Sequence, residues 1–232
     1  MSEMAKNNHI NNEIYIHDLN SYAIGASNCL SIPFDKLLRD GFNTRQTSVR
    51  PAKSVSTAAQ LIAVILQIQS LSLFGGVSAT HLDWTMVPYV RKSFHKHWID
   101  GMEYAEDCLN YKESPYYKEH FNKENIPTIS INDSVYMSDV FTNAYRYAIN
   151  MTERELAQAA EGLYHNLNSL QSRSGNQLPF TSINYGTCTL PEGRMVIKAL
   201  LEGSIKGVGK HHRTPIFPCG IFQVGEGINK HK

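Results

Sequence analysis

Apolar residues recur every three or four positions over most of the chain, which is the spacing of amphipathic helices. This pattern predicts a helix over residues 55–74, capped by Ser54 and stopped by Gly75-Gly76, and its nearly continuous apolarity indicates burial. Two more helices should begin at Thr152-Glu-Arg-Glu155 and Thr189-Leu-Pro-Glu192, which have the spacing of capping boxes, and run to about residues 170 and 205. The remaining helical segments are predicted at residues 34–39, at 83–111 with an interruption near Pro88, and at 134–150.

Alternating apolar and polar residues predict strands between these helices. Such segments occur at residues 13–17, 27–32, 180–185 and 214–223. The second should end at Pro33, and the fourth is interpreted as a strand despite Pro215 and Pro218. Residues 115–127 and 206–213 are predicted to be loops. Because strands alternate with long helices, the expected fold class is α/β with a mainly parallel sheet.

Composition and charge indicate a globular protein that stays inside the cell. The 232 residues include 22 Lys and Arg against 21 Asp and Glu, and a formal charge of +1 predicts no general attraction to nucleic acid or to an anionic membrane. The polar N-terminus lacks the apolar run of a secretory signal, which favours a cytoplasmic location. No Asp, Glu, Lys or Arg occurs from Ser54 to Leu82, but the glutamines and serines there favour a buried helix over a membrane span.

The four cysteines form no C-x-x-C pair, which favours reduced thiols over disulfides or a zinc site. Cys29 lies in a predicted strand beside Asn28, whose side chain could help to bind a small polar ligand, although a structural thiol is the alternative. Cys108 is expected on a helix beside acidic residues, which raise a thiol pKa. Cys188 precedes a predicted helix N-terminus, a position that stabilises a thiolate, and Cys219 lies in a predicted strand.

Several polar segments could contact a ligand, but each has a simpler explanation. His95 and His97 are two residues apart, so on a helix they do not face the same way, and neither they nor His211-His212 are expected to bind a metal. The basic turn at 207–213 could touch phosphate, but it is not a Walker loop. The polar turn at 172–177 could serve a ligand at a strand end or be an ordinary connection. A hydrolase that pairs Cys188 with either histidine of the 211–212 pair lacks a third residue to orient the imidazole.

A series of short motifs occurs in one unbroken order along nearly the whole chain. They are Asn12-Glu-Ile-Tyr-Ile-His-Asp-Leu19, Asn28-Cys-Leu30, Pro51-Ala-Lys-Ser-Val-Ser-Thr-Ala-Ala59, Phe74-Gly-Gly76, His165-Asn-Leu-Asn168, Ser172-Arg-Ser-Gly-Asn-Gln-Leu-Pro-Phe180, Ser182-Ile-Asn-Tyr-Gly-Thr187, Pro191-Glu-Gly-Arg194 and Thr214-Pro-Ile-Phe-Pro218. Together they resemble the large subunit of the anaerobic, class III ribonucleoside-triphosphate reductases. The resemblance implies a ten-stranded α/β barrel of the glycyl-radical enzyme type, with several long helices, of which residues 1–232 form the first part as a single domain. It also implies reduction of ribonucleoside triphosphates to deoxyribonucleoside triphosphates by radical chemistry, with formate as reductant.

The resemblance also assigns candidate site residues. Cys29 corresponds to the family's catalytic cysteine on the first barrel strand, where the thiol faces the substrate ribose. A thiol suits this role because its S–H bond is weak enough to give hydrogen to a carbon radical. Asn28, Ser182 and Asn184 are the candidate substrate-binding residues. No residue is expected to bind a metal. Cys188 and Cys219 match no catalytic cysteine of the family.

Parts of the family pattern have no counterpart in residues 1–232. These parts are the N-terminal ATP-cone, the finger-loop cysteine, the C-terminal glycyl-radical motif and its four-cysteine zinc site, so no cofactor is expected in this chain. The chain is therefore expected to be inactive alone, as a split-gene product or a relic. Expected partners are ribonucleoside triphosphates, a complementary C-terminal chain or a second copy, and the family's radical-SAM activase, with a deoxynucleotide effector as a further candidate. The alternative is a non-catalytic fragment that dimerises or binds an effector through the helices around 55–74.

Overall fold

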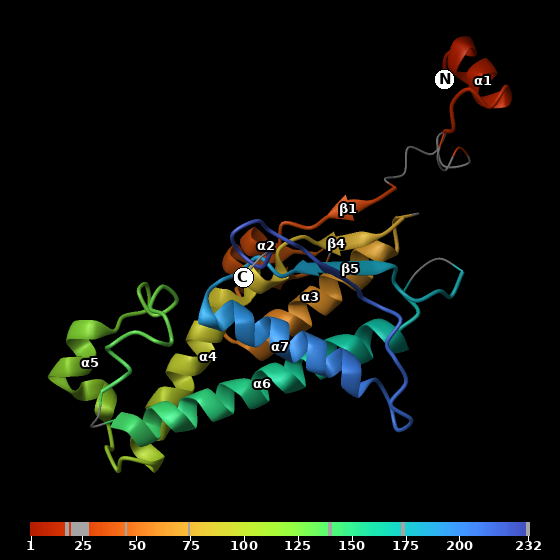
Figure 1. Cartoon of the computed structure of the whole chain (residues 1–232). Coiled ribbons are helices and arrows are strands. Elements are labelled where there is room, and N and C mark those ends of the chain that lie inside the picture. The colour runs from red at the N-terminus through yellow and green to blue at the C-terminus, as the bar shows by residue number, and fades with distance from the viewer. Residues whose placement is uncertain are drawn as a thin grey trace.

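A parallel sheet lies on a layer of long helices in the computed structural model, which describes residues 1–16, 19, 28–44, 46–73, 75–138, 141–172 and 175–230 (Figure 1). The sheet has four strands in the order β1-β4-β5-β6. They are β1 Leu30–Ser31, β4 Val77–Ala79, β5 Thr181–Tyr185 and β6 Cys219–Phe222. Every neighbouring pair is parallel. The predicted α/β class and parallel sheet are confirmed, whereas four strands do not establish the ten-stranded barrel that the resemblance implies.

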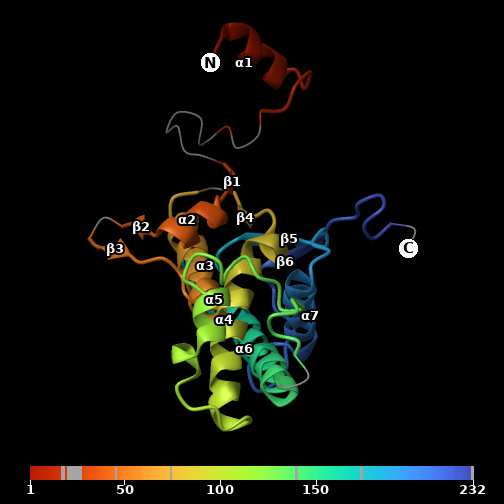
Figure 2. The same cartoon turned by 90° about the vertical axis from the view of Figure 1, so that its left-hand side faces the viewer.

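The long helices all lie on one side of this sheet (Figure 2). The helices are α1 Glu3–Ile10, α2 Phe34–Asp40, α3 Val55–Ser70, α4 Leu82–Tyr104, α5 Pro115–His120, α6 Thr142–Ser169 and α7 Pro191–Lys206. A short antiparallel hairpin, β2 Phe42–Asn43 with β3 Ser48–Val49, stands at the side of α3. Helix α1 stands away from the rest and buries none of its residues.

The main hydrophobic core lies between the sheet and helices α3, α4, α6 and α7. Val77 and Ile183 from the strands are fully buried in it, together with Leu66 from α3 and Leu167 from α6. The apolar stretch after Ser54 is thus a buried helix, as its sequence predicts, but it ends at Ser70 and not at the predicted residue 74. No helix in the described parts of the chain is long and apolar enough to cross a membrane.

A second cluster of aromatic side chains fills the far end of α4, around the fully buried Phe94 and Trp98. His95 lies within it, and its two ring nitrogens bond the hydroxyls of Tyr136 at 3.0 Å and Tyr117 at 3.2 Å. Burial lowers the pKa of His95 to about 4, so the ring is neutral at physiological pH. A neutral imidazole held by two hydroxyls is a satisfied core group and not a metal ligand.

Two helix predictions are wrong because tertiary packing outweighs local signals. Helix α4 continues through Pro88 and ends at Tyr104, since buried residues on both sides of the proline hold it in place. Helix α6 is one helix where two were predicted, and its residue Thr152 is no cap. The Thr152 side chain is fully buried, and its hydroxyl donates to the carbonyl oxygen of Ala148 at 2.7 Å. A capping hydroxyl belongs at a free helix end, and this one lies in mid-helix.

The strand predicted at residues 13–17 is also wrong for residues 13–16. His17 lies outside the described residues. The backbone N–H groups of Glu13 and Ile14 donate to the carbonyl oxygen of Asn8, so this segment closes helix α1. Helix α1 itself was not predicted, although Ser2 gives the signal by accepting a bond from the Ala5 N–H at 3.2 Å.

The other boundaries shift in smaller ways. Strand β1 is shorter than the predicted 27–32, of which Ser27 lies outside the described residues. Helix α5 occupies part of the predicted 115–127 loop, and of the predicted 134–150 helix, residues 134–136 form a turn and residues 137 and 138 have no regular structure. Helix α7 begins at Pro191 without a side-chain cap. Strand β4 and the β2–β3 hairpin were not predicted because each is only two or three residues long.

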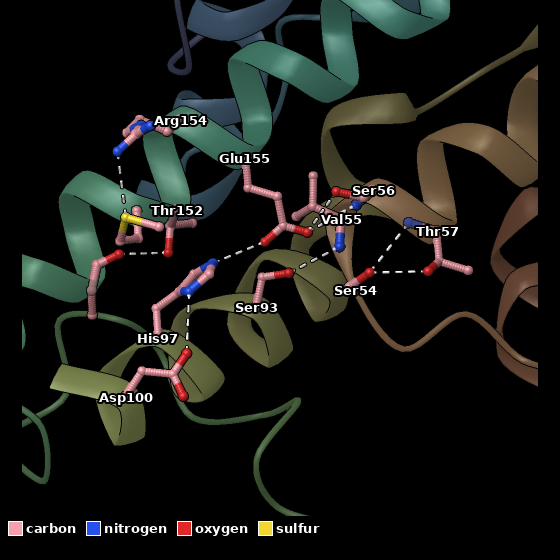
Figure 3. A network of polar contacts seen from close by, with 12 residues as sticks. Ser54, Val55, Ser56, Thr57, Ser93, His97, Asp100, Thr152, Arg154 and Glu155 are labelled. Atoms are coloured by element: carbon pink, nitrogen blue, oxygen red, sulfur yellow. Dashed lines mark hydrogen bonds and ion pairs between the residues drawn. The ribbon is translucent and has the colours of Figure 1, made fainter. Parts of the chain in front are cut away.

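A polar network joins α3, α4 and α6 beneath the sheet (Figure 3). The carboxylate of Glu155 accepts hydrogen bonds from the Ser56 N–H at 3.1 Å and the Ser56 hydroxyl at 2.8 Å. It also bonds His97 Nε2 at 3.0 Å, while the Val55 N–H donates to the Ser93 hydroxyl at 3.0 Å. Burial alone raises the pKa of Glu155, but the bonds from His97 and Ser56 outweigh it and lower the pKa to about 2.

Glu155 should therefore stabilise the fold at neutral pH and lose this effect in acid. Its folded-state pKa lies below the ordinary glutamate value of 4.5, so the contribution is complete above that pH and disappears as pH falls towards about 2. A shift of this size corresponds to about 3 kcal/mol at most. Urea unfolding of Glu155→Gln should show a large loss at pH 7 and a smaller loss at pH 3.

The matched control is Glu153→Gln on the same helix, where the carboxylate meets Lys198 at 3.3 Å and both side chains are about half exposed. This exposed pair should contribute at most about 1 kcal/mol at either pH. An equal loss of stability for Glu155→Gln at pH 7 and pH 3 would show that its charge does not support the network.

Candidate functional site

The face of the sheet away from helices α3, α4, α6 and α7, called the open face below, carries a row of small polar side chains, with the apolar Ile221 of β6 in register with Asn184 of β5. Ser31, Ser78, Ser182 and Cys219 stand in one register row across β1, β4, β5 and β6. Registered residues of parallel strands point to the same side, and the alternate residues of β4 and β5 are buried on the helices. The row of hydroxyls and one thiol therefore points away from the core.

Cys29 immediately precedes β1 and its residue is exposed. Its Sγ lies 4.0 Å from Oδ1 of Asn28, at the limit of a sulfur hydrogen bond. The backbone of this segment is already paired with the chain leading into β4, because the Gly75 N–H donates to the Asn28 carbonyl oxygen at 2.6 Å. Cys29 is thus an exposed residue on a backbone that the sheet holds in place. That it faces a ribose stays a prediction.

Ser182 and Asn184 lie two residues apart in β5 and so share the open face. Both are half-buried. The Oδ1 atom of Asn184 is buried, and no donor from the described parts of the chain bonds it. A buried acceptor without a partner is costly, so it is available for the hydroxyl or amine of a ligand. The structure places both residues on one face of the predicted 180–185 strand, and their binding role stays a prediction.

Cys188 corrects an expectation about thiol reactivity. The residue is 3% exposed and follows β5 in the loop before α7. Burial raises the pKa of the Cys188 thiol, and the nearby carboxylates of Asp83 and Glu192 raise it further. The helix N-terminus therefore does not produce a thiolate here, because desolvation of the charged form outweighs it. His212, its candidate partner in a hydrolase, is exposed and bonds the Lys206 carbonyl oxygen instead at 2.9 Å.

Asp83 organises the loop after β5, and sequence reasoning missed it. Its fully buried carboxylate accepts the N–H groups of Gly186 and Cys188, each at 2.9 Å, through Oδ2. The next residue, Trp84, donates its indole N–H to the Thr187 hydroxyl at 3.1 Å. The start of α4 therefore fixes the chain at the carboxyl end of β5, the edge where parallel sheets present ligand-binding loops.

Glu192 was predicted as a capping residue but forms a buried ion pair. Its Oε1 accepts from Arg91 Nε and from the Ile131 N–H, each at 2.9 Å, and the side chain has no exposed surface. Burial alone raises the pKa of Glu192, but the bonds from Arg91 and Ile131 outweigh it and lower the pKa. Arg91 also donates to the carbonyl oxygen of Thr128 at 2.8 Å. The pair thus joins α4, α7 and the segment between α5 and α6.

The other candidates from the sequence are not assembled into a site. His97 bonds Glu155 while His95 bonds two tyrosines, so the two histidines are separated as predicted. Cys108 lies in the turn after α4 and not on the helix, where its N–H donates to the Met102 carbonyl oxygen at 2.8 Å. Within the described ranges, no three His, Cys, Asp or Glu side chains come together as metal ligands.

The two polar turns that could contact a ligand remain without a tested role. Residues 207–213 form a turn closed by paired backbone bonds between Val208 and Arg213, at 2.8 and 3.1 Å. Of the turn at 172–177, residues 173 and 174 lie outside the described part of the chain.

Comparison with known proteins gives one consistent family. The family model described as anaerobic ribonucleoside-triphosphate reductase matches residues 1–232. The relative of that name from Haemophilus influenzae is 27% identical over 226 residues, which cover 97% of this chain and 27% of the relative. The relative from Enterobacteria phage T4 is 28% identical over 221 residues, covering 94% and 30%, and the one from Escherichia coli is 27% identical over 225 residues, covering 97% and 26%. The chain thus spans less than a third of the length of these curated relatives.

Proposed function

Because the chain belongs to the anaerobic ribonucleoside-triphosphate reductase family, we propose that it forms part of an enzyme that reduces ribonucleoside triphosphates to deoxyribonucleoside triphosphates. Cys29 is the thiol that acts on the ribose in this proposal. The observation that supports it is the exposed residue Cys29 immediately before β1, next to the row of serine hydroxyls on the sheet face away from helices α3, α4, α6 and α7. Hydroxyl and amide groups on this surface can orient a sugar by hydrogen bonds to its hydroxyl groups.

The proposed reaction replaces the ribose 2′-hydroxyl with hydrogen. The C2′–O bond breaks, a C2′–H bond forms, and water leaves, which consumes two electrons. In the mechanism of the family that this sequence resembles, formate supplies these electrons and is oxidised to carbon dioxide. A thiol contributes by giving its hydrogen atom to a carbon radical of the sugar. The radical itself is proposed to be generated outside this chain.

Ser182, Asn184 and Asn28 are the proposed substrate-binding residues. The free acceptor on Asn184 and the hydroxyl of Ser182 would bond ribose hydroxyls or other polar groups of the nucleotide. The amide of Asn28 lies beside the Cys29 thiol and would orient both thiol and sugar. Each of these contacts uses a neutral group, which suits the uncharged part of a nucleotide.

We propose that the chain works with a partner and is inactive alone, since it spans at most 30% of the relatives it matches. Among the described strands, β1 and β6 each have a neighbour on one side only. Near β6, the side chains of Ile221, Phe222 and Val224 are about half exposed or more. Unpaired strand edges beside apolar surface favour pairing with another polypeptide. A complementary chain and the family's radical-SAM activase are the proposed partners.

A second candidate function is binding of a deoxynucleotide effector without catalysis. It is favoured by a hollow of about 670 Å³ between α3, α2 and the β2–β3 hairpin, a volume that can hold a nucleotide. The residues that line it are Leu37, Phe42, Asn43, Thr44, Gln46, Ile65, Ile68, Gln69, Leu71 and Ser72. Its amide and hydroxyl groups could bond a base or sugar, and its apolar residues could pack against the base.

The two candidates are separated by one set of assays. The purified chain is incubated with CTP, formate and activase, alone and together with the remaining part of a family member's sequence, and dCTP is measured by chromatography. We expect no product from the chain alone and product from the mixture. Product from the chain alone would contradict the need for a partner. Absence of product from the mixture, with tight binding of dATP in equilibrium dialysis, would favour the effector-binding fragment.

A further inference from the structure

Two consecutive glycines precede β4, and each leaves room for a side chain from a neighbouring strand segment. A Cβ atom on Gly75 would lie 2.5 Å from Sγ of Cys29, 2.3 Å from the carbonyl oxygen of Asn28 and 2.6 Å from Oδ1 of Asn28. A Cβ atom on Gly76 would instead lie 2.6 Å from the ring of Phe180. The Cys29 thiol therefore occupies the space that a side chain at position 75 would fill.

Space, and not backbone conformation, is the reason for glycine at position 75. Its φ angle does not lie in the left-handed region, which is the usual reason for a glycine, whereas Gly41 and Gly186 are in that region at +78° and +120°. Not every glycine is crowded in this way, because a Cβ on Gly162 in helix α6 would meet nothing within 4 Å. A glycine of ordinary φ beside a strand marks the close approach of another group.

We propose that Gly75 is a positioning residue for the Cys29 thiol. The absence of a side chain at position 75 lets the thiol lie against the start of β4 with Asn28 Oδ1 beside it, on a backbone tied by the bond from the Gly75 N–H to Asn28. A methyl group at this position pushes the sulfur out towards solvent and separates it from the amide. The functional meaning of this inference rests on the proposed role of Cys29 in nucleotide reduction.

The test measures the thiol directly and needs no nucleotide reduction, so its failure is distinct from failure of the proposed function. The folded 232-residue chain is treated with iodoacetamide, and alkylation of Cys29 is compared by mass spectrometry with that of Cys219, which is also exposed. Gly75→Ala should raise the ratio of the Cys29 rate to the Cys219 rate by about threefold or more, because a sulfur displaced from its rotamer beside β4 is more accessible to the reagent.

Two variants serve as controls. Gly162→Ala adds the same methyl group where nothing is near, and Gly76→Ala adds it against Phe180 and away from the thiol. Both should leave the alkylation ratio unchanged. A ratio that does not rise in Gly75→Ala, or that rises equally in Gly76→Ala, would overturn the proposal.

A second measurement applies if Gly75→Ala is too unstable for the alkylation assay. Its loss of Tm is measured in the natural chain and in a Cys29→Ala background, from which the sulfur is gone. Because part of the crowding is against Sγ, the loss should be several degrees smaller in the Cys29→Ala background. Equal losses in both backgrounds would show that position 75 does not respond to the thiol.

Discussion

Substitution Cys29→Ala should abolish dCTP formation by the complemented enzyme. The chain would then lack the thiol that is proposed to give hydrogen to the sugar, while the alanine methyl group preserves the backbone of the segment before β1. A lost reacting group leaves no alternative route, so product should fall to background, a loss of at least about a thousandfold. Formation of the glycyl radical by the activase should be unchanged, because the radical is proposed to arise outside this chain.

The control is Cys108→Ala, which removes a thiol from the turn after α4, where Cys108 packs against the aromatic cluster. Its rate of dCTP formation should stay within about twofold of the natural chain, since the turn belongs to no part of the open face. The radical signal is measured by electron paramagnetic resonance in parallel. Substantial dCTP from the Cys29→Ala complex, with a normal radical signal, would show that the family role does not carry over to this position.

Much of the fold could be predicted where local signals and packing agree. Helix α3 begins where the Ser54 side chain caps it, accepting from the Thr57 N–H at 3.2 Å, and its apolar run is buried as predicted. Strand β5 alternates buried and half-buried residues from Thr181 to Tyr185. The alternating apolar and polar residues of its sequence predict this pattern. These elements are encoded within a few residues, and so a single sequence is enough to find them.

The remaining features depend on contacts between distant parts of the chain. Glu155 has the spacing of a capping-box residue, but it lies in the interior of a long helix. Its partner Ser56 is 99 residues away in the sequence. Asp83 reaches a backbone N–H group 105 residues further on, at Cys188. The sequence places a polar residue at each position without showing which group it meets.

The candidate site divides in the same way. Cys29 could be identified from its residue type and its motif, whereas the crowding of its thiol against Gly75 could not, because a glycine pair in sequence has several possible reasons. The row formed by Ser78, Ser182 and Cys219 requires the strand register, which sequence alone does not give.

The largest expected effect on stability is that of Glu192→Ala. This change leaves the Arg91 side chain, which is only 12% exposed, without its carboxylate partner. It also removes the acceptor of the Ile131 N–H. Breaking a buried ion pair by removing one partner costs about 3–5 kcal/mol, because the remaining charge stays desolvated. The Tm should fall by roughly 10 °C for a chain of this length.

An exposed ion pair between α6 and α7 provides the matched comparison for this prediction. Lys206 and Glu161 approach to 2.6 Å, but their side chains are 58% and 39% exposed. Glu161→Ala should therefore cost less than about 1 kcal/mol. Replacing both members of the buried pair by apolar residues, Arg91→Met with Glu192→Leu, should recover part of the stability lost in Glu192→Ala, because neither charge then remains unpaired. If urea unfolding gives Glu192→Ala and Glu161→Ala the same small loss, the Arg91–Glu192 pair is not what joins α4 to α7.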